Sequence, residues 1–145
     1  MAHFEQLLLV EKIKVRPKSL WMLHRDLVFH SDILGCTIRV PSQFVTDFAS
    51  VPRWIPLGYA MLGGKGDEAA VIHDWLYSTQ KYSREVADKV FEEALISLGY
   101  SAATVSLMYT GVSAGGWYTW RKKNVPQFPK IVALEPAAFE AYAPA

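Results

Sequence analysis

Cysteine is almost missing from the chain, since Cys36 is the single one among 145 residues. One thiol excludes an intramolecular disulfide framework, so the simplest environment for the fold is a reducing cytoplasm. Long apolar runs are missing as well, because no segment approaches the roughly 18 consecutive apolar residues of a membrane span. The first residues also lack a basic segment followed by an apolar run. We therefore expect no membrane span and no secretion signal.

The chain also lacks a charge excess, since its formal net charge is +1 at pH 7. Such a balance builds in no overall attraction to nucleic acid or to anionic lipid, and we predict no nucleic-acid partner. Hydrophobic residues make up 51% of the sequence and charged residues 20%, which excludes the composition of disordered chains. The length is sufficient for one buried core.

The first third of the chain carries no sustained helical period. Residues 4–15 are predicted to be extended or irregular before Pro17, whereas alternating and β-branched patterns over 21–29 and 37–40 predict two strands joined by a loop. Prolines 41, 52 and 56 exclude a long helix or a central strand from the segment between them. We interpret that segment as an ordered loop rich in potential ligands.

Three helices are expected after this loop. The first covers residues 68–78 with Asp67 as its cap, and the second begins after Ser83 and stops at Gly99. A third helix is predicted over 102–120, where glycines spaced four apart would permit close approach of a neighbouring helix.

Together these elements predict an α+β fold, with a small antiparallel sheet from the N-terminal third packed on a helical hairpin and a third helix. Residues 1–125 are expected to form a single globular domain. Residues 126–145, which contain several prolines, are interpreted as an extended C-terminal arm with a short turn near 136–142.

One polar constellation stands out on the helical hairpin. His73 and Tyr77 are four residues apart and share a helix face, and Asp74 lies about 100° round the helix from His73. Asp88 lies at the margin of the apolar stripe of the second helix, where a buried carboxylate needs a donor or a cation. In an antiparallel hairpin Asp88 can bond one ring nitrogen of His73 and leave the other to accept a proton from water. The alternative is that the pair only joins two helices.

Three segments resemble a family of uncharacterised proteins of tailed bacteriophages and prophages, a domain of unknown function. They are FVTDFASVPR at 44–53, AAVIHDWLY at 69–77 and ADKVF at 87–91, and the resemblance covers roughly residues 20 to 120. It implies a phage gene product without an agreed activity. We expect a virion protein, structural or for assembly and tail-associated, whose partners are other virion proteins or a second copy of itself. It would reside in the host cytoplasm during assembly and then in the virion.

A weaker resemblance is to the phospholipase A2 domains of parvovirus capsids. Residues 67–77 are similar to their Asp-x-Ala-Ala-x-x-His-Asp-x-x-Tyr helix, and 87–91 to their Ala-Asp-x-x-Phe segment. The resemblance implies a calcium-assisted hydrolase of lipid esters acting during infection or lysis. In that hypothesis the general base is His73, its orienting partner is Asp88, and Tyr77 supports them.

The same resemblance implies that Asp74 is a calcium ligand. Calcium takes six to eight oxygens, so carbonyls of a glycine-containing loop, with Gly58 and Gly63, would complete its shell. The chain is similar more distantly to the secreted phospholipases A2, from which it departs because it lacks their disulfides and their Tyr-Gly-Cys calcium loop. Asp47 either supplies a further ligand or caps a turn.

Ser50 and Arg53 are further candidate residues in the same loop. Trp54 and Trp75 are interpreted either as an apolar rim for a lipid or protein partner or as core aromatics. Two hypotheses therefore remain open, a non-catalytic virion component and a hydrolase. They are compatible, because a virion protein can carry an enzymatic pocket.

Overall fold

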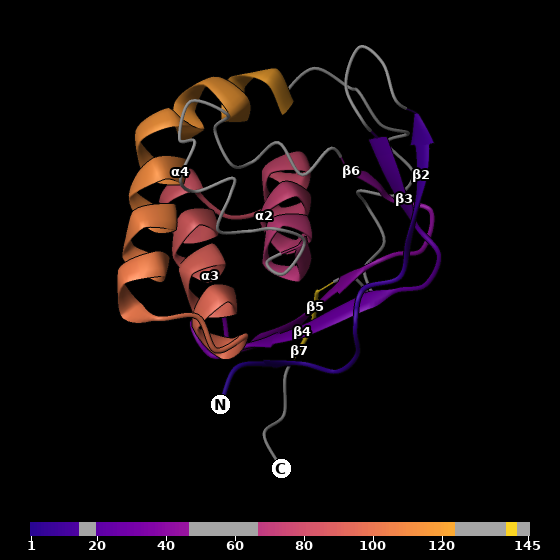
Figure 1. The fold of residues 1–145 in the computed structure, drawn as a ribbon, viewed down its shortest axis with the longest axis horizontal. Helices are drawn as coiled ribbons and strands as arrows, with labels where there is room; N and C mark the ends of the chain where they lie inside the picture. Colours follow the sequence, from indigo (N-terminus) through magenta and orange to yellow (C-terminus); the bar gives the residue numbers. More distant parts are fainter. Residues whose placement is uncertain (15–19, 47–66, 124–138, 142–145) are drawn as a thin grey trace.

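The computed structural model describes residues 1–14, 20–46, 67–123 and 139–141, and these form an α+β fold as predicted. Antiparallel strands from the N-terminal part lie beside three helices (Figure 1).

The larger sheet has four strands in the order β1-β4-β5-β7, all antiparallel. Its strands are β1 (His3–Phe4), β4 (Leu27–Ser31), β5 (Cys36–Val40) and β7 (Phe139–Ala141). The turn between β4 and β5 contains Gly35 at φ 62°, a backbone conformation that glycine adopts without strain. The turn expected near 136–142 is wrong for its described part, because β7 completes the sheet there by pairing with β5.

A second sheet has three strands in the order β2-β3-β6. These are β2 (Val10–Lys14), β3 (Leu20–Leu23) and β6 (Val45–Thr46). The single strand expected over 21–29 is therefore wrong, since β3 and β4 belong to different sheets. The polar run His24-Arg25-Asp26 breaks the alternation between them, and the backbone N–H of His24 donates to the carbonyl of Leu9 instead.

The helices are α2 (Asp67–Thr79), α3 (Arg84–Ser97) and α4 (Ala102–Lys123). The predicted cap of the second helix is confirmed, because the hydroxyl of Ser83 accepts a hydrogen bond from the amide of Val86 at 3.3 Å. Its predicted stop is confirmed as well, since Gly99 follows the last turn with φ 88°.

Helix α2 is the centre of the core and lies between α3 and the sheets in Figure 1. Every residue from Ala69 to Tyr77 is buried, including the polar side chains of His73 and Asp74. A helix enclosed on all sides must pair its polar groups with neighbours, because water does not reach them. None of the helices in the described ranges has the length and apolar character needed to span a membrane.

Candidate functional site

The α2–α3 hairpin brings the imidazole of His73 against the carboxylate of Asp88, as the sequence predicted. Nε2 of His73 lies 2.7 Å from Oδ1 of Asp88, and the two side chains are 1% and 2% exposed. The two helices are joined by a short connection in which Gln80 has φ 51°. The predicted contact between the two helices is therefore confirmed, whereas a catalytic role for it remains a prediction.

Tyr77 completes this pair from one turn further along α2. Its hydroxyl donates to the same Oδ1 of Asp88 at 2.6 Å, and its ring centroid lies 4.2 Å from that of His73. Burial, followed by the hydrogen bond to Asp88 and the negative charge of Asp88, raises the pKa of Tyr77 above its ordinary value, and the cation of Arg84 offsets this in part. Tyr77 is therefore a protonated donor to the carboxylate.

The second ring nitrogen of His73 has no such partner. Nδ1 is buried, and no hydrogen-bonding group among the described residues reaches it. An ionised carboxylate only accepts hydrogen bonds, so the neutral tautomer of His73 that fits this contact carries its proton on Nε2 and has its lone pair on Nδ1. Leaving a buried polar atom without a partner costs about 1–3 kcal/mol, and Nε1 of the core residue Trp75 on the same helix is a second such atom.

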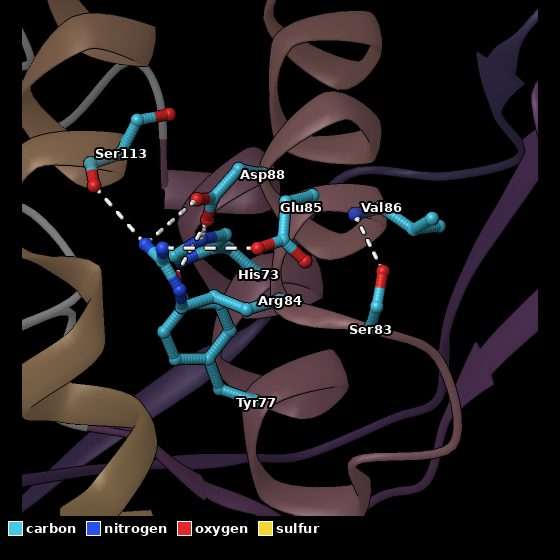
Figure 2. Close-up of polar contacts among 8 residues, drawn as sticks. All are labelled: His73, Tyr77, Ser83, Arg84, Glu85, Val86, Asp88 and Ser113. Atoms are coloured by element: carbon cyan, nitrogen blue, oxygen red, sulfur yellow. Dashed lines mark hydrogen bonds and ion pairs between the residues drawn. The ribbon is translucent and has the colours of Figure 1, made fainter.

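Arg84 faces the other oxygen of Asp88, a contact that the sequence reasoning missed. Its Nη1 lies 3.8 Å from Oδ2 of Asp88 and donates a hydrogen bond to the carbonyl of Ser113 on α4 at 3.0 Å (Figure 2). The available signal was spacing, because Arg84 precedes Asp88 by one helical turn. Asp88 therefore contacts His73 and Tyr77 through Oδ1 and Arg84 through Oδ2.

Helix α4 approaches this cluster most closely at Gly116. A Cβ built there would lie 2.4 Å from the hydroxyl oxygen of Tyr77 and 3.2 Å from Nη1 of Arg84. The sequence reasoning expected close approach at the glycines spaced four apart, Gly111 and Gly115. At Gly116, the neighbour of Gly115, a side chain would collide with the cluster, whereas the expectation for Gly111 and Gly115 stays a prediction.

Asp74 lies on a different face of α2. It is fully buried, and its Oδ2 accepts a hydrogen bond from the hydroxyl of Thr46 at 2.8 Å. Calcium requires several oxygen ligands, and no group of three or more His, Cys, Asp or Glu side chains in the described ranges is arranged to hold a metal ion. The described residues therefore do not by themselves fit the calcium site that the phospholipase resemblance implies.

The other predicted site residues fall outside the described residues. They are Asp47, Ser50, Arg53, Gly58 and Gly63, together with Trp54 of the suggested apolar rim.

Trp75 belongs to the core, since it is 1% exposed and its ring meets Phe44 edge-on at 5.2 Å. This decides between the two interpretations of Trp75 in favour of a core aromatic.

A family model described as "Protein of unknown function (DUF1353)" matches residues 21–112. The match runs from β3 into α4 and includes His73, Tyr77, Arg84 and Asp88, whereas Gly116 lies beyond it. No curated protein and no solved structure gives a significant match. Since the matched segment is more than half of the 145 residues, the chain belongs to the DUF1353 family.

Proposed function

We propose that His73 and Asp88 form a general-base dyad of a hydrolase, with attack of water on a lipid ester as its most concrete reaction. The observation that carries this proposal is the hydrogen bonding of the two ring nitrogens of His73. Nε2 is bound to the buried carboxylate while Nδ1 keeps a lone pair that no described group uses. That is the arrangement in which an imidazole can take a proton from a nucleophile.

The reaction proceeds in two steps on this geometry. Nδ1 of His73 takes a proton from water while the water oxygen bonds to the ester carbonyl carbon, and Asp88 stabilises the resulting imidazolium through Nε2. The tetrahedral intermediate then expels the alkoxide, and the proton on Nδ1 passes to that alkoxide oxygen. The products are a carboxylic acid and an alcohol, and His73 is returned to its neutral form.

Asp88 is well suited to orient the base. Its Oδ1 accepts bonds from both His73 and Tyr77, so the carboxylate cannot rotate without losing two hydrogen bonds. The ring of His73 is also held between the rings of Tyr77 and Phe91, with centroid distances of 4.2 and 4.9 Å. A fixed imidazole presents its lone pair in one direction, which general-base catalysis requires.

Calcium remains a separate part of this hypothesis. The resemblance assigns Asp74 as a ligand, and the candidate loop residues that would complete a shell lie outside the described ranges. No step of the reaction above passes through a metal. A bound calcium ion would supply electrostatic stabilisation of the developing oxyanion.

The test measures ester hydrolysis by the full-length protein. Phospholipid vesicles and a soluble p-nitrophenyl ester are offered with calcium and with a chelator, and released fatty acid or p-nitrophenol is quantified. We expect His73→Gln to lower kcat by at least about 100-fold. His24→Gln is the matched control, because His24 is 44% exposed and pairs with Glu11 in another part of the fold. Wild-type protein without hydrolysis, or His73→Gln with wild-type activity, would refute the proposal.

We further propose that the chain is a bacteriophage virion protein, tail-associated and present in the host cytoplasm during assembly. The resemblance of residues 44–53, 69–77 and 87–91 to proteins of tailed bacteriophages supports this role. Exposed apolar side chains support a contact with other virion proteins or a second copy: Leu7, Leu9 and Ile13 are 75%, 50% and 46% exposed.

Mass spectrometry of purified phage particles tests the virion role. The expected result is that peptides of this chain copurify with the tail in a constant ratio to other tail proteins across a density gradient. Peptides found only in the host lysate would contradict the virion role and leave the hydrolase proposal to its own test.

A further inference from the structure

We propose that Arg84 is a positioning residue of the dyad, held in place by α4, that shares the charge of Asp88 and thereby sets the strength of the bond to His73. This inference rests on the proposed function of the dyad. It concerns a residue that does not contact the reacting Nδ1 and acts on His73 through Asp88.

Asp88 is a buried carboxylate, and its ionised form is stable only beside a cation or several hydrogen-bond donors. Its side chain is 2% exposed. Two donors meet at Oδ1, from His73 and Tyr77, and both are neutral in the working form of the dyad. Within the described ranges, Arg84 is the permanently charged side chain that faces Oδ2, at 3.8 Å.

Helix α4 determines where the guanidinium lies. Nη1 donates to the carbonyl of Ser113 at 3.0 Å, and Gly116 leaves the space into which Nη1 and the Tyr77 hydroxyl fit. Figure 2 shows the guanidinium between Ser113 and Asp88. Nη2 of the same guanidinium also pairs with Glu85 at 3.8 Å, whereas the bond to Ser113 is made with a backbone group that a substitution of the Ser113 side chain does not remove.

The groups bound to Oδ1 and the guanidinium that faces Oδ2 therefore compete for the negative charge of Asp88. Charge drawn toward Arg84 is less available to His73, so the Nε2–H donation to Oδ1 is weaker than it would be beside an isolated carboxylate. Arg84 is 28% exposed, which screens this effect without cancelling it. Removing the cation should strengthen the bond between His73 and Asp88, although it weakens the fold.

The experiment follows the Nε2 proton of His73 by NMR in the full-length protein. A proton bonded to a buried carboxylate gives a resonance far downfield, and its absence in His73→Gln assigns it. We expect Arg84→Gln to move this resonance further downfield and Arg84→Lys, which keeps the charge, to return it toward the wild-type position. A general loosening of the helices would instead move it upfield or remove it.

Two control variants isolate the cause. Lys89→Gln removes the same charge from α3, but Lys89 pairs with Glu92 and lies over the ring of Tyr109, so the resonance should not move. Ser113→Ala keeps the accepting carbonyl and should also leave it unchanged. A resonance unmoved or shifted upfield in Arg84→Gln would overturn the role of Arg84 while the dyad stands. If wild type lacks the resonance, the dyad itself and the proposed function fail.

Discussion

The contact between Gly116 and the Tyr77 hydroxyl predicts a strong coupling in a double-mutant cycle. An alanine at 116 would place Cβ 2.4 Å from the hydroxyl oxygen, whereas ordinary contact begins near 3.4 Å, so the two groups must separate by 3.4 − 2.4 = 1.0 Å. That movement breaks the 2.6 Å bond from Tyr77 to Asp88. Overpacking costs about 1–3 kcal/mol and a lost bond to a charged group about 1.5–3 kcal/mol. The helix propensity of alanine returns up to about 1 kcal/mol, so we expect Gly116→Ala to destabilise by roughly 1.5–6 kcal/mol.

The same substitution should be harmless when the hydroxyl is absent. In Tyr77→Phe the nearest ring atom to a Cβ at 116 is Cζ at 3.5 Å, an ordinary contact. The remaining close contact is Nη1 of Arg84 at 3.2 Å, the end of a flexible side chain that has to move by only a few tenths of an ångström. Gly116→Ala is then expected to be neutral or stabilising by up to about 1 kcal/mol. Urea unfolding of the four proteins measures a coupling of about 3 kcal/mol.

Ser106→Ala, at an exposed position on α4, serves as the control. It should change the free energy of unfolding by the same amount in wild type and in Tyr77→Phe. If Gly116→Ala costs the same in both backgrounds within about 0.5 kcal/mol, the close packing of α4 on the cluster is not present in solution.

Three further outcomes are expected from the described contacts. Because the folded-state pKa of Tyr77 is raised above its ordinary value of 10.0, its contribution to stability is complete below pH 10 and is lost as the pH rises above it. Between pH 10 and 11 wild type should lose about 1 kcal/mol more unfolding free energy than Tyr77→Phe, and equal losses in urea titrations would contradict this. Thr46→Val removes the donor to buried Asp74 and should lower the unfolding free energy by about 1.5–3 kcal/mol; an unchanged urea midpoint would show that this bond does not form. Glu93 accepts bonds from a hydroxyl and two amides at the β4–β5 turn, so Glu93→Gln should accelerate hydrogen exchange of those two amides, and unchanged protection would argue against the contact.

Local signals in the sequence were sufficient to predict the three helices and the contact between His73 and Asp88. Ser83 and Gly99 marked the ends of α3 because capping and positive-φ preferences depend on near neighbours. The bond from His73 to Asp88 followed from helix periodicity plus a short connection, which together leave few arrangements. These features needed no knowledge of distant segments.

Features that depend on distant segments were missed or misplaced. Pairing of β7 with β5 joins residues about a hundred positions apart, and nothing local to Phe139–Ala141 indicates that partner. Arg84 showed only an i,i+4 spacing, and its anchor is a backbone carbonyl that carries no sequence signature. The close approach at Gly116 depends on the rotation of α4 about its axis, which periodicity does not fix within one residue.

The burial of His73 and Asp88 limits the rate at which any reagent can react with His73. With His73 and Asp88 at 1% and 2% exposure, a water or ester molecule reaches Nδ1 only during a brief opening of the surrounding side chains or helices. If the proposed hydrolysis takes place at His73, its turnover is limited by the frequency of that opening and not by the rate of proton transfer. Acylation by diethyl pyrocarbonate would report this frequency directly, with His73 labelled far more slowly than the exposed His24.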